Sequence, residues 1–194
     1  MTREVSVDEN PGRGLSYALI TTAIGRIGIA WSDRGVVRLQ LPESDDATTV
    51  ASLIRGGEMV ASPLSARMVL LADALECYGR GERRDFSATP LDLSGLPDFH
   101  RTIYAATLRL SWGETATYGQ LADRVGAAGA ARAVGQAMAR NPIPVIIPCH
   151  RVLASGQRMG GFSAPGGGIT KARLLALEGV HLGGTPSLPG LFSD

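Results

Sequence analysis

The sequence predicts an α/β protein of the α+β type, with a small antiparallel sheet domain first and a mostly helical domain second. Residues 16–41 contain β-rich segments separated by short glycine turns, and the following stretch repeats apolar side chains at helical spacing. The second half contains several short helical patterns. A turn-rich bridge between the halves places the domains at residues 1–93 and 94–180, and a Gly- and Pro-rich tail at residues 181–194.

The strands and the main helix of the first domain follow from local signals. The breaks at Ile24-Gly25 and Asp33-Arg34-Gly35 have the spacing of a three-stranded antiparallel meander. The helix is predicted from apolar side chains that recur every three or four residues, and glycines end it. These apolar residues are Leu64, Met68, Leu71, Leu75 and Tyr78, and the glycines are Gly79 and Gly81.

The second domain contains a predicted helix-turn-helix. The segment DFHRTIYAATLRL has a helix-compatible apolar pattern. Thr117 and Gln120 then have the spacing of a capping box, which predicts a short helix from Tyr118 to about Val125. The small residues GAAGA form the turn, and AARAVGQAMARN forms a second short helix that ends before Pro142.

Composition excludes several classes of protein. The chain has 194 residues, of which 44% are apolar and 19% charged, as in ordinary globular proteins. It lacks both a secretory signal and the run of about 18 apolar residues that a membrane span needs, so we expect a cytoplasmic protein without membrane contact. The two cysteines, Cys77 and Cys149, and three histidines lack zinc-finger spacing. We expect no metal and no cofactor.

The charge is distributed unevenly. Residues 101–180 carry nine basic and three acidic side chains, a balance of +6, whereas the rest carries ten basic and fifteen acidic, a balance of −5. Such asymmetry indicates that the second half meets a polyanion. Eight of the nine basic residues are arginines, which suit bidentate contacts with phosphate.

The second helix of the helix-turn-helix has a nearly bare surface. A reader of the major groove usually carries several long polar side chains, whereas a slim helix can approach the minor groove, with an arginine filling a gap in the base stack. The alternative, which we favour from this pattern alone, is that the small residues pack against neighbouring elements. The small residues are Ala131, Ala133, Gly135 and Ala137, and the long ones are Arg132, Gln136 and Arg140.

The segment PVIIPCHRV is the candidate reactive site. A cysteine after an apolar run is more often a core residue, but here Pro148 and two polar residues end the run. A thiolate nucleophile needs a base, for which His150 is suited, and Arg151 adds favourable charge. Glu178 is the candidate carboxylate that orients the imidazole. Because neighbours on an extended segment point to opposite sides, a local turn or a bridging water would have to connect Cys149 with His150.

These motifs resemble one protein family. RAVGQAMARNPIPVIIPCHRV, followed by KARLLALEG and preceded by TYGQLA, is similar to the O6-alkylguanine-DNA alkyltransferases, also called methylated-DNA–protein-cysteine methyltransferases. The resemblance is continuous over about residues 96–180 and weak over residues 1–95. It implies a monomer with a ribonuclease-H-like first domain and a second domain that contacts the minor groove of double-stranded DNA. Its substrate is O6-alkylguanine, with O4-alkylthymine as a second one, and each molecule acts once.

The resemblance also implies roles for individual residues. Cys149 is the alkyl acceptor, His150 the base acting through water, Glu178 its orienting carboxylate, Asn141 the brace of the turn and Tyr118 the residue that rotates the nucleotide. The DNA-contacting set comprises Arg132, which fills the vacated stack, with Thr117, Ala133, Gly135, Gln136, Arg140 and Arg151. The pocket set comprises Met138, Met159, Phe162 and Ser163.

The loop after the cysteine departs from the family pattern. Phe162 stands where the family usually has tyrosine, so the ring is kept and a hydroxyl is lost. GGFSAPGGGITK is two residues longer than the commonest family form, so the far wall of the pocket is a place where this chain differs.

Three other functions compete with alkyl transfer. An alkyltransferase-like protein flags lesions without reacting, but such proteins replace the cysteine that this chain keeps as Cys149. A cysteine hydrolase would need an oxyanion site, for which the sequence gives no signal. A transcription factor built on the helix-turn-helix would prefer one sequence, whereas phosphate-dominated binding predicts strong salt dependence and little sequence preference.

Overall fold

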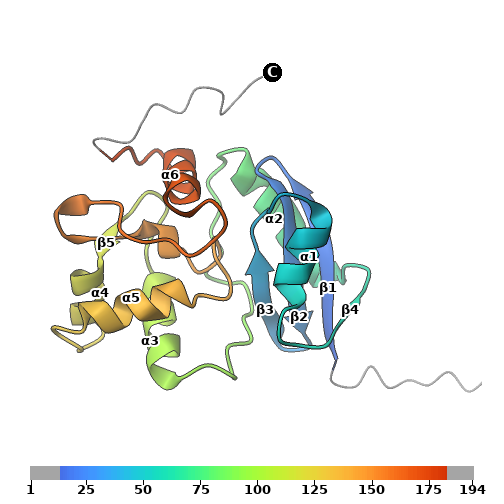
Figure 1. The fold of residues 1–194 in the computed structure, drawn as a ribbon, viewed down its shortest axis with the longest axis horizontal. Coiled ribbons are helices and arrows are strands. Elements are labelled where there is room, and N and C mark those ends of the chain that lie inside the picture. Colours follow the sequence, from blue (N-terminus) through green and yellow to red (C-terminus); the bar gives the residue numbers. More distant parts are fainter. Residues whose placement is uncertain (1–13, 183–194) are drawn as a thin grey trace, which may run out of the picture.

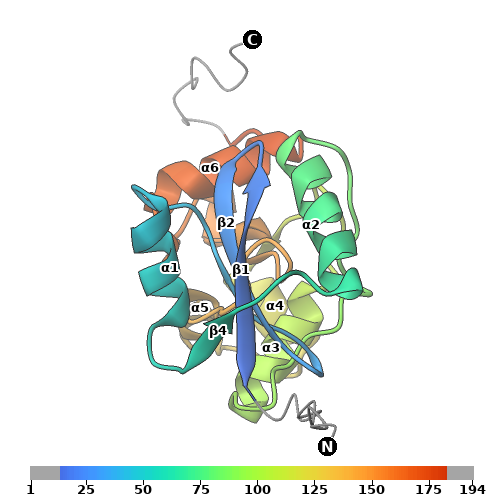
Figure 2. The same ribbon diagram turned by 90° about the vertical axis from the view of Figure 1, so that its right-hand side faces the viewer.

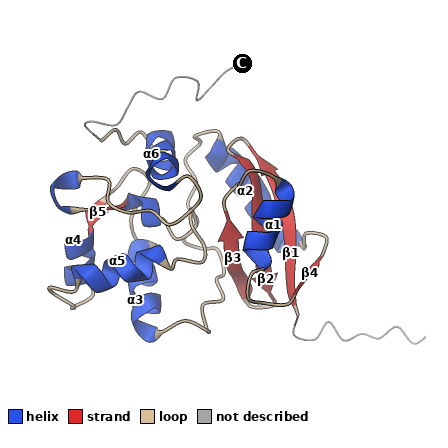
Figure 3. Ribbon diagram, viewed as in Figure 1, coloured by secondary structure: helices blue, strands red, loops and turns tan. Residues whose placement is uncertain are grey.

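The structure is a computed structural model that describes residues 14–182. It has two parts, shown in Figure 1: a sheet with two helices, and a helical part built around a pair of very short strands. Figure 3 shows that the long strands all lie in the first part and that helices dominate the second. The mixed α/β class predicted from the sequence is confirmed, and the ribonuclease-H-like assignment stays a prediction.

The four-stranded sheet has the order β3-β2-β1-β4. The predicted meander is confirmed, because β1 (Leu15–Thr22), β2 (Gly25–Ser32) and β3 (Gly35–Gln40) pair antiparallel in sequence. Strand β4 (Met59–Ala61) adds to the edge, parallel to β1.

Two helices flank this sheet (Figure 2). Helix α2 (Ala66–Gly79) is the predicted main helix, and the Ser65 hydroxyl caps its first turn. Helix α1 (Asp46–Ile54) was not predicted, although Asp45 caps it through a 2.7 Å bond from the Thr48 amide. The first domain therefore has two helices rather than one. Helix α1 escaped prediction because it is short and buries only two side chains.

The helical part matches the predicted helix-turn-helix. Helix α3 (Asp98–Thr107) packs against α4 (Tyr118–Arg124) and α5 (Ala131–Ala139). The capping box of α4 is confirmed: the Gln120 amide donates to Thr117 Oγ1 at 3.1 Å, and Gln120 Oε1 accepts from the Thr117 amide at 2.8 Å.

Elements far apart in sequence meet behind α4 and α5. Strand β5 (Ala116–Thr117) pairs parallel with β6 (Val152–Leu153), which brings the start of α4 beside the segment that follows Cys149. Helix α6 (Gly167–Leu177) covers this region and contacts the turn that starts at Cys149.

The two parts share one hydrophobic core. Buried side chains of the sheet and of the helical part form a single cluster, which includes Ile29, Leu75 and Ile103 and reaches Cys149. The Leu39 amide of β3 also donates to the Pro142 carbonyl oxygen at 2.9 Å. The sheet is thus fixed against the segment that leads into the candidate site.

Candidate active site

Asn141 holds the apolar segment that leads to Cys149. Its Nδ2 donates to the Ile147 carbonyl oxygen at 2.8 Å, and its Oδ1 accepts from the Ile143 amide at 3.0 Å. Within this segment Val145 has φ of 73°, an unfavourable backbone conformation for a β-branched residue. Such strain persists only where surrounding contacts determine the backbone, so the approach to Cys149 is a closely fixed loop.

Cys149 and His150 lie in a 3-10 turn, Cys149–Arg151. Of the two alternatives that the sequence left open, the local turn is the one present, because Pro148 leads directly into it and the Arg151 amide bonds back to the Pro148 carbonyl oxygen at 2.9 Å. All three residues of the turn are buried. The turn sends its polar side chains into the protein.

The buried Glu178 carboxylate, just beyond α6, collects five hydrogen bonds. Its Oε1 lies 2.7 Å from His150 Nε2 and accepts from Arg151 Nη2 at 2.9 Å and from the Tyr78 hydroxyl at 3.1 Å. Its Oε2 accepts from Arg151 Nε at 2.7 Å and from the Gly113 amide at 3.1 Å. We call these five residues the Glu178 network.

These contacts set the charge states of Glu178 and His150. Burial opposes ionisation of Glu178, but the hydrogen bonds from His150 and Arg151 outweigh it and lower its pKa to about 2. Burial is also the largest effect on His150, and it lowers the pKa of the imidazole despite the neighbouring carboxylate. At neutral pH the site holds a carboxylate beside a neutral imidazole.

The hydrogen bonds also assign the tautomer of His150. Because Nε2 lies 2.7 Å from an ionised carboxylate, we place the proton on Nε2. The other ring nitrogen, Nδ1, is buried and has no hydrogen-bond partner within the described part of the chain. Nδ1 is therefore an unused acceptor, as a general base requires.

The Cys149 thiol is protonated at rest. Its side chain is buried, and burial raises its pKa, although Asn141 and the nearby Lys171 ammonium act in the opposite direction. A buried thiol in this state needs a base to become a nucleophile. The free nitrogen of the adjacent His150 meets that need.

Arg151 corrects one prediction made from the sequence. We expected it to contact DNA, but it is 6% exposed and its guanidinium is used inside the protein. Besides its two bonds to Glu178, it donates to the Leu110 carbonyl oxygen at 2.6 Å. Its charge balances Glu178 and is not available to a phosphate.

Lys171 of α6 is a buried residue that the sequence reading did not single out. Its Nζ donates to the Val152 carbonyl oxygen at 2.6 Å and lies 5.9 Å from the centre of the Tyr118 ring. Burial lowers its pKa to about 8. The signal was present, because Lys171, Leu174 and Glu178 fall on one helical face.

A pocket of about 280 Å³ opens at Cys149. Six of its lining residues come from the predicted sets, and Met159 is half-buried and outside the lining. The Tyr118 hydroxyl donates to the Gly161 carbonyl oxygen at 3.4 Å, which ties α4 to the loop after Cys149. The lining consists of Tyr118, Gly135, Met138, Ala139, Cys149, Gly161, Phe162 and Ser163.

The first domain also reaches the candidate site. A second hollow, of about 510 Å³, adjoins Cys149 and is lined by Arg38 and Gln40 of β3 and by Arg55 beyond α1. Arg38 is held by bonds from its guanidinium to two carbonyl oxygens, of Leu53 and Arg55, at 2.7 and 2.8 Å. Nothing in the sequence of the first domain had indicated this position.

Helix α5 presents its long side chains outward. Arg132, Gln136 and Arg140 are exposed, and Gly135 lies at the pocket with open space where a Cβ would be. Ala133 is half-buried, whereas Val134, Ala137 and Met138 form the buried face. Ala137 packs inward, as the packing alternative predicts, whereas Gly135 leaves the outer surface of the helix slim, as the minor-groove alternative predicts. Thr117 is half-buried and caps α4.

Two absences hold for residues 14–182. That region contains no group of three or more His, Cys, Asp or Glu side chains suited to a metal ion. None of its helices is both long and apolar enough to cross a membrane.

Comparison with known proteins identifies relatives of this site. A family profile for the DNA-binding domain of 6-O-methylguanine DNA methyltransferase matches residues 98–180. The chain is 34% identical over 192 residues to the methylated-DNA–protein-cysteine methyltransferase of Mus musculus, covering 91% of this chain and 87% of that protein. It is 47% identical over 107 residues to the Mycobacterium tuberculosis (strain H37Rv) protein of that name, and the match spans 62% of that protein.

A solved structure is similar over most of the chain. The crystal structure of Mycobacterium tuberculosis OGT in complex with DNA has a TM-score of 0.70 and 33% identity, and the match covers 84% of this chain and 93% of that one. The likeness therefore includes the sheet domain as well as the helical one.

Proposed function

The chain belongs to the family of methylated-DNA–protein-cysteine methyltransferases, and we propose that it repairs DNA by moving the alkyl group of O6-alkylguanine onto Cys149. O4-alkylthymine is the second proposed substrate. The observation that carries the proposal is a buried thiol at a pocket, next to a histidine whose Nδ1 is free and whose Nε2 faces a carboxylate.

The proposed reaction begins with the thiol. The Cys149 proton passes to His150 Nδ1, through water, and the imidazolium is stabilised by Glu178. The sulfur then attacks the alkyl carbon, an S–C bond forms, and the C–O6 bond breaks with its electron pair on the guanine. Tyr118 lies at the pocket and supplies a proton to guanine N3. The proton held by His150 then returns through solvent to the Tyr118 phenolate, so the guanine gains overall the proton that the thiol loses. The thioether product is stable in water, and each molecule acts once.

The substrate base must first leave the double helix, because O6 is otherwise hidden in the duplex. We propose that α5 enters the minor groove and that Arg132 fills the vacated stack. The exposed arginines and the glycine at the pocket mouth support this placement. Gln136 and Arg140 would contact the backbone, and Thr117 and Ala133 would lie along the same surface.

The remaining proposals concern organisation. We propose a cytoplasmic monomer with domains at residues 1–93 and 94–180, in which Asn141 braces the reactive turn and Met138, Phe162 and Ser163 line the base pocket. The contacts of Asn141 and the pocket lining support these roles. No contact of Met159 supports a place for it in the pocket.

The test is the intact mass of the full chain before and after incubation with duplex DNA that contains O6-methylguanine. We expect one added methylene unit per molecule, confined to the peptide that contains Cys149, and no addition in Cys149→Ser. An unchanged mass with damaged DNA still bound would overturn the proposal and favour a lesion-binding module.

A further inference from the structure

Tyr78 is a residue of the sheet domain that reaches the reactive histidine. It lies in the last turn of α2 and is fully buried. Its hydroxyl donates to Glu178 Oε1 at 3.1 Å and lies 3.3 Å from His150 Nε2, across 100 and 72 residues of sequence. The only other member of the Glu178 network from outside the turn and the end of α6 is a backbone amide, that of Gly113.

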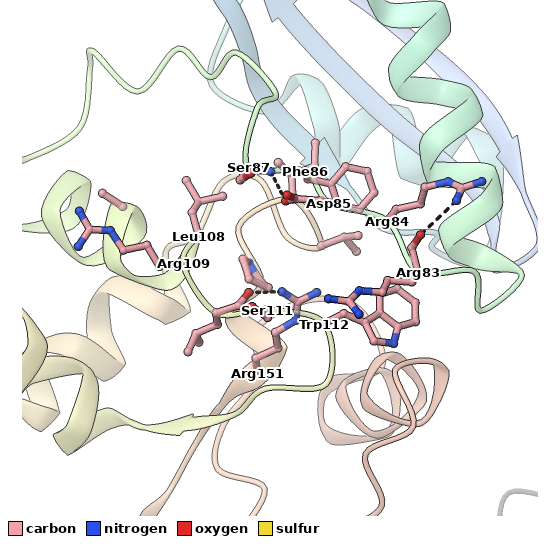
Figure 4. Close-up of a pocket in the computed structure, with 15 residues that line it drawn as sticks. Arg83, Arg84, Asp85, Phe86, Ser87, Leu108, Arg109, Ser111, Trp112 and Arg151 are labelled. Carbon is pink, nitrogen blue, oxygen red and sulfur yellow. Dashed lines mark hydrogen bonds between the residues drawn. The ribbon is translucent and has the colours of Figure 1, made fainter.

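Aromatic packing fixes the direction of this hydroxyl. The Tyr78 ring meets Phe86 and Trp112 edge-on, with centroids 5.8 and 5.5 Å apart. Phe86, Trp112 and Arg151 line a cavity of about 540 Å³ behind the reactive turn, and Figure 4 shows the Arg151 side chain beside Trp112. Edge-on pairs restrain a ring, so the phenol cannot turn away from Glu178 without disturbing this wall.

We propose that Tyr78 is a positioning residue for alkyl transfer: its hydroxyl keeps Glu178 and His150 in the arrangement that leaves His150 Nδ1 free for the Cys149 proton. The inference rests on the proposed function and extends it, since it makes the sheet domain part of the reactive site. Tyr78 touches neither the thiol nor the base pocket in the described contacts.

The effect of the hydroxyl on His150 has a definite sign. A donor to Oε1 offsets part of the carboxylate charge that would otherwise attract a proton to the imidazole. Without it, the imidazolium is better stabilised and the pKa of His150 rises. Burial and Glu178 raise the pKa of Tyr78 itself, so its hydroxyl stays a donor throughout the neutral range.

The other charged and titratable groups near His150 are not altered by replacing Tyr78 with phenylalanine. They are Glu178 and Lys171 from α6 and its end, and Arg151 and Cys149 from the turn of His150 itself. Arg151 and Lys171 both oppose a positive imidazole. A change seen on removing the hydroxyl alone therefore reports on Tyr78.

The test compares Tyr78→Phe with Tyr104→Phe in the full chain. Tyr104 is a matched control, because it is also fully buried and its hydroxyl makes one bond, to the Ala137 carbonyl oxygen at 2.7 Å. The rate of single-turnover transfer from O6-methylguanine duplex is measured from pH 5 to 9. We expect the acid limb of Tyr78→Phe to move up by roughly one pH unit, with a plateau within about tenfold of wild type. Tyr104→Phe keeps the acid limb of wild type.

Nitrogen NMR of the histidine rings separates this inference from the proposed function. In wild type we expect a neutral His150 with the proton on Nε2, and in Tyr78→Phe a higher pKa, whether or not transfer occurs. An unchanged pH profile and an unchanged His150 pKa in Tyr78→Phe would overturn the inference. So would finding the His150 proton on Nδ1 in the wild-type protein, a measurement that does not depend on the variant folding. A wild type that transfers no alkyl group would instead overturn the proposed function.

Discussion

The two sides of Cys149 are built in opposite ways. Behind it, His150, Arg151 and Glu178 are buried, and both His150 and Arg151 form hydrogen bonds with the Glu178 carboxylate. In front of it, Arg132 and Arg140 stand in solvent. Removing one partner of a buried ion pair strongly destabilises the folded protein. Exposed charges add little to stability and stay free to bind phosphates. The proposed function thereby assigns reactivity and DNA binding to separable sets of residues.

Removing the negative charge of Glu178 should have the largest effect on both stability and transfer rate. Glu178→Gln leaves Arg151 buried without its counter-ion and removes the carboxylate that stabilises the His150 imidazolium. We expect the free energy of unfolding to fall by about 3 kcal/mol and the transfer rate to fall by about 100-fold. Urea unfolding and single-turnover kinetics measure the two.

The control for this change is an exposed ion pair in the same half of the chain. Glu114 pairs with Arg124 at 3.3 Å, and both side chains are at least 40% exposed. Glu114→Gln should cost less than about 1 kcal/mol. Equal losses in the two variants would contradict the distinction between the two sides of Cys149.

The buried side also has a characteristic pH dependence. The pKa of Lys171 is lowered to about 8 from 10.5, so above pH 8 the unfolded chain binds a proton that the folded chain has released. The contribution of this group to the free energy of unfolding therefore rises with pH, by about 2 kcal/mol between pH 8 and 9.5. Cys149 acts in the opposite sense, because its pKa is raised by burial.

Comparison with Lys171→Met isolates the lysine. We expect the difference in unfolding free energy, wild type minus Lys171→Met, to grow between pH 8 and 9.5. A difference that stays constant would mean that Lys171 keeps its proton in the folded protein. Urea titrations at four pH values in that range are sufficient.

The exposed side should respond in binding and not in stability. Arg132→Ala is expected to change the free energy of unfolding by no more than about 0.5 kcal/mol. Transfer from duplex DNA at limiting protein concentration should fall about tenfold, since the side chain proposed to fill the vacated base stack is removed. With O6-methylguanine as a free base, which needs no flipping, the variant and wild type should react alike.

Arg173 of α6 provides a matched control, since it too is exposed. Arg173→Ala removes the same charge away from α5 and should leave duplex transfer within about twofold of wild type. If both variants lose transfer equally, Arg132 acts through net charge alone.

Features that depend on neighbouring residues were predictable from the sequence, whereas features that depend on distant contacts were not. The capping box of Thr117 and Gln120 was found because it depends on four adjacent residues. Helix α1 and strand β4 were missed because they are short and rely on pairing with the sheet. Cys149, His150 and Glu178 were singled out from residue chemistry and from the family resemblance, and their roles stay predictions.

Charged residues were harder to place. Arg151 was assigned to DNA from the family resemblance, and the sequence does not show that Glu178 lies across from it. Tyr78 entered the prediction only as part of the apolar pattern of a helix, but its hydroxyl meets groups 72 and 100 residues away. Such contacts depend on how the two domains pack, which local patterns do not encode.

The smallest expected effect concerns Phe162, where the pocket departs from the family pattern. Phe162 is half-buried and lines the pocket beside Cys149. Phe162→Tyr keeps the ring and adds a hydroxyl, so transfer of a methyl group should stay within about threefold of wild type. Phe162→Ala removes the ring and should slow transfer at least about tenfold. If Phe162→Tyr instead accelerates transfer more than tenfold, the pocket wall limits the rate as much as the Glu178 network does. The comparison between the buried and the exposed side of Cys149 would then have to include the loop that contains Phe162.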